Sequence, residues 1–459
     1  MARSVTMVDE VPLNKFHIKL TTFTSGGPFI DGYALSVLGI ALITLQPGLN
    51  MTPVEVGLLG ASTLIGIFVG GGVFGWVTDK VGRHTMYIVD LIALAVFSIA
   101  SGLATETWHV ILARFLLGIA IGADYPIATS LLAEFLPRKY RGRMLGATFV
   151  VWAVGAAAAY LVGFLLKDIG PDAWRWLLAS PAVFAVITLL FRLGTPESPR
   201  WLYSQGRYEE ARTVIKKVWG DDFDLENLGE LDTNASTPRS TLKSVFQGIL
   251  LKRTIFVAAF WTLQVIPMFA VYTFAPDLLA SFGMTGDANL YGGSLIISSM
   301  FVVGGIPGLW LVEKIGRKAL LLWTFGIATV ALAVPFFIPN VSPHVLFASL
   351  AIFAISSGAA NFLQIVYPNE LFPTEVRATA VGIGTAASRI GSAVSTYLMP
   401  WAILNIGASN SLLIGALIAL AGVIVTALLG EETMGRSLTD TSTGEIPVAQ
   451  TPTATTQAH

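Results

Sequence analysis

Long apolar segments recur along the chain and are separated by short polar turns. A helix needs roughly 20 mainly apolar residues to cross the hydrocarbon core of a bilayer. Such a helix satisfies its own backbone hydrogen bonds, which an isolated strand in lipid cannot do. The pattern therefore predicts an all-α membrane protein with twelve transmembrane helices, at residues 17–46, 53–77, 86–104, 108–136, 145–166, 174–193, 254–282, 291–312, 319–338, 343–367, 379–405 and 410–430.

One long polar segment interrupts this series after the sixth span. It contains EEARTVIKKVW, which has the spacing of an amphipathic surface helix, and DTNASTPRS, which is typical of a flexible linker. The polar, Thr-rich C-terminus is predicted to be disordered. We therefore divide the chain into a six-helix bundle at 1–193, a cytoplasmic linker at 194–253, a second six-helix bundle at 254–437 and a tail at 438–459.

The two six-span units repeat each other in sequence. WVTDKVGRH at 76–84 matches WLVEKIGRK at 310–318. Four further matches share one offset of 236 residues: Glu134 with Glu370, Pro137 with Pro373, Arg141 with Arg377, and Gly146 with Gly382. A duplicated six-helix unit predicts two pseudo-symmetric bundles that rock about a site at the midplane, as in secondary transporters.

Composition and charge agree with this picture. Hydrophobic residues make up 54% of the 459 residues and charged residues 12%, whereas soluble domains carry about 25% charged residues. The 28 Lys and Arg residues lie in the termini, in the even-numbered loops or at the adjoining span ends, apart from Arg114, Lys167, Arg175 and Arg389. Basic loops stay in the cytoplasm, so we expect a multi-pass protein of the plasma (inner) membrane with both termini cytoplasmic.

Several function classes find no support in the sequence. The five His residues are dispersed and there is no Cys, so no metal or nucleophile cluster indicates an enzyme. No phosphate-binding G-x-x-x-x-G-K-[ST] motif indicates an ATP-driven pump. We expect no cofactor, no metal and no nucleic-acid partner. A non-transporting receptor or a channel stays open as an alternative.

Asp31, Arg114 and Asp124 are charged residues that stand inside predicted spans. A charge near the bilayer centre costs at least roughly 2.5–3.5 kcal/mol, so it normally faces a partner or a watery cavity. Desolvation favours a protonated Asp31 and a nearby cation favours an ionised one, a combination suited to proton exchange. We expect Arg114 to be that cation, released when Asp31 binds a proton. The alternative is a static buried ion pair.

Several motifs resemble those of the major facilitator superfamily, in its sugar-porter and organic-ion branch. They are GWVTDKVGRH at 75–84, RFLLGIAIG at 114–122, PESPRWL at 196–202 and the second copy ending in EKIGRK. The resemblance covers nearly the whole chain and implies a transporter that works by alternating access. Proton-coupled relatives in this branch carry an Asp on the first helix and an Arg on the fourth, as Asp31 and Arg114 do here.

The resemblance also implies a cytoplasmic charge latch that holds the outward-facing state. The alternative is that these charges only fix the topology of the loops. The members of the latch would be the charged residues of the two repeated motifs: Asp79, Arg83, Glu134, Arg138 and Arg141 in the first unit, and Glu313, Arg317, Glu370 and Arg377 in the second.

Arg389 is the residue most informative about the substrate. It lies within the eleventh span, among small residues, and a guanidinium offers a planar fork of donors that suits a carboxylate. The surrounding sequence resembles organic-anion and aromatic-acid transporters that carry an Arg at this place. We therefore expect a small organic anion. A structural Arg, with a neutral sugar or polyol as substrate, stays open.

Other polar and aromatic residues are expected to complete the cavity. Gln264 falls where sugar porters place a substrate-binding Gln, and a phosphate symporter of this branch would have an Asp on that helix. Asp124, in GADYPIATS, resembles the GDYP segment of those symporters and is a candidate second proton or substrate site, or a packing residue at a kink. The remaining cavity candidates are Tyr33, Trp152, Trp261, Tyr272, Asn361 and Gln364.

These observations together predict a proton-coupled symporter that imports a small organic anion. Its partners would be the substrate, protons and the lipid bilayer, and we expect a monomer. The alternatives are a proton-coupled or facilitative sugar or polyol transporter and, with less support, a phosphate transporter.

Overall fold

The computed structural model describes residues 8–192, 195–228, 244–284, 286–338, 340–372 and 374–434. Every element assigned within them is helical. The long segments are α1 (Lys15–Thr24) with α2 (Gly26–Gly48), α3 (Pro53–Val81), α4 (Arg83–Gly102), α5 (Thr107–Phe135), α6 (Arg138–Leu166), α7 (Ala173–Ala179) with α8 (Pro181–Arg192), α11 (Gly248–Ser281), α12 (Asp287–Ile315), α13 (Arg317–Phe337), α14 (Pro343–Asn361) with α15 (Leu363–Leu371), α16 (Thr374–Asn405) and α17 (Ala408–Leu429).

Eleven of these described segments are long and apolar enough to cross a membrane. The twelfth long helix, α16, has 32 residues but carries Arg389 and a series of Ser and Thr side chains. The prediction of an all-α protein built from membrane-spanning helices is confirmed. The predicted span at 145–166 agrees with the apolar segment Gly146–Ile169, and α6 extends beyond it, because the helix already begins at Arg138.

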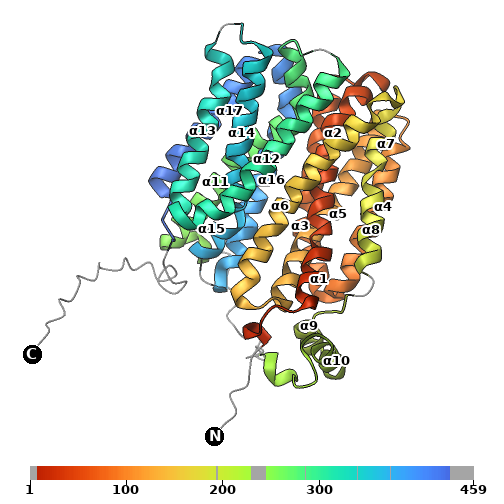
Figure 1. The fold of residues 1–459 in the computed structure, drawn as a ribbon, viewed down its shortest axis with the longest axis vertical. Helices are drawn as coiled ribbons and strands as arrows, with labels where there is room; N and C mark the ends of the chain where they lie inside the picture. Colours follow the sequence, from red (N-terminus) through yellow and green to blue (C-terminus); the bar gives the residue numbers. More distant parts are fainter. Residues whose placement is uncertain are drawn as a thin grey trace, which may run out of the picture.

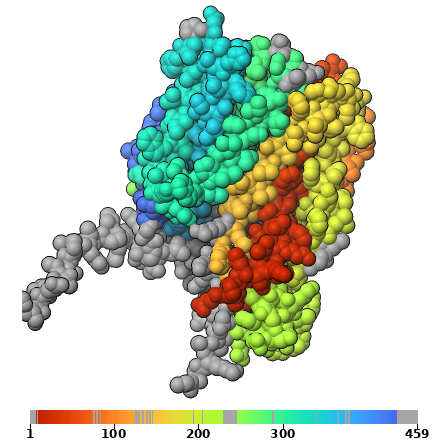
Figure 2. Space-filling view, viewed as in Figure 1, coloured from red at the N-terminus to blue at the C-terminus, as the bar shows by residue number. Residues whose placement is uncertain are grey.

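The helices form two bundles that lie side by side (Figure 1). The N-terminal half contains α1 to α8 and the C-terminal half α11 to α17, and the two halves touch along α2 with α11, α3 with α16 and α6 with α12. The space-filling view shows α6 and α12 adjoining along the front of the molecule (Figure 2). A site between the halves is therefore bounded by these six helices.

Glycines allow the same close helix crossing in each half. In the N-terminal half a Cβ at Gly122 of α5 would overlap the backbone of Ile67 in α3. In the C-terminal half a Cβ at Gly358 of α14 would overlap the backbone of Phe301 in α12. The two glycines stand 236 residues apart in the sequence, so the repeat predicted from the loop motifs extends into the packing of the spans.

The first part of the linker packs against one end of the N-terminal half, below α1 in Figure 1, whereas its last short helix contacts α11 and α16. It contains α9 (Pro199–Ser204), α10 (Tyr208–Trp219) and the short helices η3 (Leu225–Leu228) and η4 (Ser244–Phe246), and two further short helices are η1 (Val8–Glu10) and η2 (Lys167–Ile169). The Asn14 side chain donates to the Val218 carbonyl at 2.9 Å, and Trp219 stacks on Phe135. The predicted amphipathic helix is present as α10, whereas the predicted flexible segment 232–240 lies outside the described residues. We call this end of both bundles the linker side.

Gly358→Ala tests the close crossing of α12 and α14. The added Cβ meets backbone atoms of Phe301 that cannot turn away, and overpacking of this kind costs about 1–3 kcal/mol. We expect a lower thermal unfolding midpoint in detergent. Gly326→Ala in α13 is the matched control, because no atom lies within 4 Å of its Cβ position and Ala favours a helix. Equal midpoints for the two variants would contradict the packing described here.

Candidate functional site

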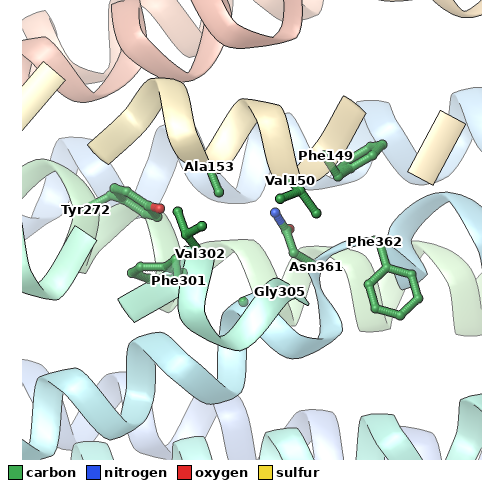
Figure 3. A pocket seen from close by; sticks show the side chains of 10 residues that line it. Phe149, Val150, Ala153, Tyr272, Phe301, Val302, Gly305, Asn361 and Phe362 are labelled. Atoms are coloured by element: carbon green, nitrogen blue, oxygen red, sulfur yellow. The ribbon is translucent and has the colours of Figure 1, made fainter. Parts of the chain in front are cut away.

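A small cavity of about 20 Å³ lies between the two halves (Figure 3). Phe149, Val150 and Ala153 of α6 line one wall, and the opposite wall includes Tyr272 of α11 and Asn361 of α14. The Tyr272 hydroxyl and the Asn361 Oδ1 are buried there without a hydrogen-bond partner. Two of the predicted substrate residues therefore present unsatisfied polar atoms at the interface between the bundles.

Trp152 is a third predicted residue at this interface. It lies on α6, and its ring meets the Tyr272 ring edge to face with centroids 5.8 Å apart. It also contacts Phe269 of α11 in the same manner at 6.5 Å. These rings join the N-terminal half to the C-terminal half next to the cavity.

Two predicted glutamines pair inside the C-terminal half. The Gln364 Nε2 of α15 donates to the Gln264 Oε1 of α11 at 3.2 Å, while the Gln264 Nε2 is buried without a partner. Gln264 lines a second cavity of about 10 Å³. Trp261 is buried one turn earlier on α11 and lies against Gly384 of α16, so its ring packs between helices.

Tyr33 lies away from these residues. Its hydroxyl shares a 2.7 Å hydrogen bond with Ser180, and its ring packs against Phe184 of α8 at 4.7 Å. The side chain is fully buried in the core of the N-terminal half. The prediction that Tyr33 faces the cavity is therefore wrong in this conformation, because α2 turns that residue toward α7 and α8.

Arg389 and Asp31 belong to different halves and lie within electrostatic range of each other. Arg389, on α16, is half-buried, and its guanidinium carbon lies 5.9 Å from the centre of the Phe269 ring. Asp31, on α2, is buried, and its Oδ1 has no hydrogen-bond partner. The charged groups that act electrostatically on Asp31 are Asp124, Arg389 and Arg192. The predicted anion site and the predicted proton site are thus neighbours.

Arg114 does not pair with Asp31. Its Nη2 donates to the Ala34 carbonyl of α2 at 2.6 Å, and its Nε and Nη1 are buried without hydrogen-bond partners. Ala34 stands about one helical turn beyond Asp31, so the guanidinium contacts the predicted helix, α2, but about one turn away from Asp31. The prediction of a direct Asp31–Arg114 ion pair is therefore wrong in this conformation, and the role of each residue in proton coupling stays a prediction.

Asp124 faces Arg192, the last residue of α8. Arg192 was not among the residues selected from the sequence. The Arg192 Nη1 lies 3.7 Å from the Asp124 Oδ1, and both side chains are almost fully buried. Asp90 of α4 is also buried beside this pair and was likewise missed. Asp90 is a single Asp within the apolar segment YIVDLIAL, which is the same signal that selected Asp31, whereas Arg192 was hidden among the basic residues at a span end.

Comparison with known proteins places the chain in a family. The family model described as "Sugar (and other) transporter" matches residues 20–444. This chain belongs to the sugar (and other) transporter family. Two relatives from Escherichia coli (strain K12) are the putative metabolite transport protein YaaU, 41% identical over 95% of this chain and 96% of the relative, and the inner membrane metabolite transport protein YgcS, 37% identical over 94% and 95%.

Solved structures give the same fold. The inward open conformation of the xylose transporter XylE from E. coli aligns with a TM-score of 0.77 at 19% identity, covering 93% of this chain and 99% of that one. A second XylE structure, described as a proton:xylose symporter of the major facilitator superfamily, aligns with a TM-score of 0.74 at 21% identity over 93% and 98%. This family member therefore has the major facilitator fold of two six-helix halves and is a multi-pass membrane transporter, not an enzyme.

In this transporter, two of the predicted latch residues contact each other on the linker side of the C-terminal half. Arg317 makes two hydrogen bonds to Glu370, at 2.7 and 2.9 Å. Glu432 accepts from the backbone N–H groups of Arg317 and Lys318 at the start of α13. Glu313 lies near the end of α12 and is exposed. These contacts join α13 to α15 and to the segment after α17.

The N-terminal half carries a related contact. The Glu197 carboxylate accepts from the backbone N–H of His84 at the start of α4 at 3.0 Å, as Glu432 does in the other half. A helix N-terminus favours a carboxylate at this position. The remaining latch candidates are outside the described side chains: Asp79, Arg83, Glu134, Arg138, Arg141 and Arg377. Their role in a latch stays a prediction.

Arg192→Ala tests how much the fold depends on the Asp124–Arg192 pair. Removing one partner of a buried ion pair costs about 3–5 kcal/mol, because the other charge is left unmatched. We expect a strong loss of thermal stability and partial recovery in Arg192→Ala/Asp124→Asn. Arg207→Ala is the control, since its pair with Glu210 is exposed and such pairs contribute about 0–1 kcal/mol. A small effect of Arg192→Ala would contradict the importance of the pair.

Proposed function

We propose that this transporter is a proton-coupled symporter of the inner membrane that imports a small organic anion with a carboxylate group. The observation that carries the proposal is the position of Arg389. Its guanidinium lies at the interface between the halves, near Phe269, and acts electrostatically on Asp31 across that interface. A carboxylate bound to Arg389 would take this cation away from Asp31, and an unmatched buried carboxylate favours binding a proton. Substrate and proton would then bind together.

The aromatic lining supports an aromatic or other planar carboxylate. Phe269 and Tyr272 of α11 and Trp152 of α6 gather next to Arg389 and the cavity. Rings of this kind pack against planar ligands, whereas hydrogen-bonding groups hold the hydroxyls of a sugar. A relative in Acinetobacter baylyi, 24% identical over 95% of this chain, is named a niacin transporter, and niacin is an aromatic carboxylic acid.

A neutral sugar is the second candidate. Gln264, Gln364 and Asn361 are amides on neighbouring helices, the Gln264 Nε2 and the Asn361 Oδ1 have no hydrogen-bond partner, and amides suit hydroxyl groups. Other relatives are named a glucose transporter from Staphylococcus epidermidis, 29% identical, and an arabinose-proton symporter from Bacillus subtilis, 26% identical. The names of the relatives therefore support proton coupling in this family and leave the substrate open.

Ligand-induced stabilisation separates the two candidates. A ligand present at 100 times its dissociation constant adds about 2.7 kcal/mol to the stability of the folded state. We expect nicotinate or benzoate to raise the thermal unfolding midpoint of the wild type in detergent, and the rise to disappear in Arg389→Gln. Arg207→Gln, at an exposed site, is the control and should respond like the wild type. Stabilisation by glucose or xylose, equal in all three proteins, would select the sugar transporter instead.

Asp31→Asn tests proton coupling. In proteoliposomes with an inward proton gradient, wild-type protein should accumulate the stabilising carboxylate above its outside concentration. The variant should lose this uphill uptake and retain exchange of labelled for unlabelled substrate, because exchange needs no net proton movement. Asp168→Asn, at an exposed position, should behave like the wild type. Undiminished uphill uptake by Asp31→Asn would rule out this role for Asp31.

A further inference from the structure

Asp90 and Asp124 form a pair of carboxyl groups that face each other inside the N-terminal half. Asp90, on α4, is 3% exposed and Asp124, on α5, is 0% exposed. The helices α4 and α5 pack together, and the two carboxyl groups lie within interaction range of each other. None of their four oxygen atoms nevertheless has a hydrogen-bond partner among the described residues. Buried polar atoms are normally hydrogen-bonded, and two ionised carboxylates cannot hydrogen-bond to each other because both are acceptors.

The hydrogen-bond donors near the pair, Arg192 and Tyr87, donate to other groups. Arg192 donates from Nε to the Phe23 carbonyl at 3.0 Å and from Nη2 to the Thr24 carbonyl at 2.7 Å. Only its Nη1 points at Asp124, 3.7 Å from Oδ1, and this atom also has no hydrogen bond. The Tyr87 hydroxyl, on the same helix as Asp90, donates to the Thr24 carbonyl. Neither side chain therefore supplies a hydrogen to the space between the two carboxyl groups.

The other charged groups around the pair do not donate a hydrogen to these two carboxyl groups either. Asp31 of α2 adds a third carboxyl group that acts on Asp90. Arg114, on the same helix as Asp124, donates to the Ala34 carbonyl, and Arg389 of α16 acts on Asp31. Within the described residues, Arg192 is thus the one cation that faces Asp124.

Two ionised carboxylates hold no hydrogen between them and repel each other. One added proton converts the same contact into a short, charge-assisted hydrogen bond and leaves a single negative charge for Arg192. We propose that Asp90 and Asp124 share one proton and form a proton-binding site distinct from Asp31. The pair titrates as a unit, and this holds whether or not Arg389 binds an anion.

The location of the pair connects this proton to the first span. The carbonyls that hold Arg192 belong to Phe23 and Thr24, at the break between α1 and α2. Gly27 follows the break, and a Cβ there would overlap the Asp124 carboxylate. A second negative charge on the pair would draw Arg192 away from these carbonyls, so the proton maintains the contact between α8 and the break in the first span.

Infrared difference spectroscopy tests this site without a known substrate. Purified protein carrying isotope-labelled aspartate is titrated between neutral and alkaline pH, and the absorption band of protonated Asp is followed. The background variant is Asp31→Asn/Asp277→Asn, which removes two other described aspartates of the membrane spans. We expect the band to persist in this background at neutral pH and to vanish in one step at alkaline pH. Adding Asp90→Asn or Asp124→Asn should abolish it.

The Asn variants also have a matched comparison. Asn donates from its amide to the remaining carboxylate and so replaces the shared proton, whereas Leu cannot. Asp90→Asn should therefore remain as stable as the wild type and lose pH dependence above neutral pH, while Asp90→Leu should be destabilised. Absence of the band in the background variant, which leaves the pair intact, would overturn the proposal. A band that survives both Asn substitutions would overturn it as well. Neither result depends on whether Asp31 or Arg389 works as proposed.

Discussion

Arg192 is held by two backbone carbonyls, one carboxylate and one aromatic ring. The carbonyls of Phe23 and Thr24 accept from it, Asp124 faces its Nη1, and its guanidinium carbon lies 3.0 Å from the centre of the Tyr87 ring. A buried guanidinium cannot lose its proton to escape the cost of burial, so each contact is required. Through these contacts the end of α8 is joined to the break in the first span, to Asp124 of α5 and to the Tyr87 ring of α4.

The two halves share a fold and differ in how their interiors are made polar. Their helix crossings repeat at Gly122 and Gly358, and Glu197 and Glu432 occupy matching positions at helix N-termini. The N-terminal half buries carboxyl groups with Arg192 and Arg114, whereas the C-terminal half buries amides such as Gln264. Carboxyl groups exchange protons near neutral pH when buried, and amides do not titrate. The duplicated fold thus separates groups suited to protons from groups suited to a polar solute.

The fold was largely predictable from the sequence, because apolar length in lipid permits only helices and the repeat sets the number of bundles. Helix ends were less predictable where charged residues continue a helix, as at Arg138. The site was predicted as a set of residues and not as a set of contacts. The spacing in the sequence places Asp31 and Arg114 inside spans but does not fix the rotation and level of α2 against α5. Tyr33 turned away from the interface for the same reason, and Arg192 was missed because a cation at a span end also suits topology.

Transport by this fold requires the halves to separate, because the cavities of about 20 and 10 Å³ are far below the roughly 300 Å³ at which ligand pockets begin. On the side opposite the linker, a Cβ at Gly57 of α3 would overlap the backbone of Tyr397 in α16, and Gly39 of α2 lies as closely against Thr273 of α11. On the linker side, Leu309 of α12 lies in contact range of Gly146 in α6. Backbone-to-backbone contacts at glycine are lost completely when two helices move apart by the width of a side chain, since no side chain bridges the gap. The glycine contacts on the side opposite the linker can therefore form and break as a unit, and Asp31, which is buried between the two ends, gains access to water when one set opens.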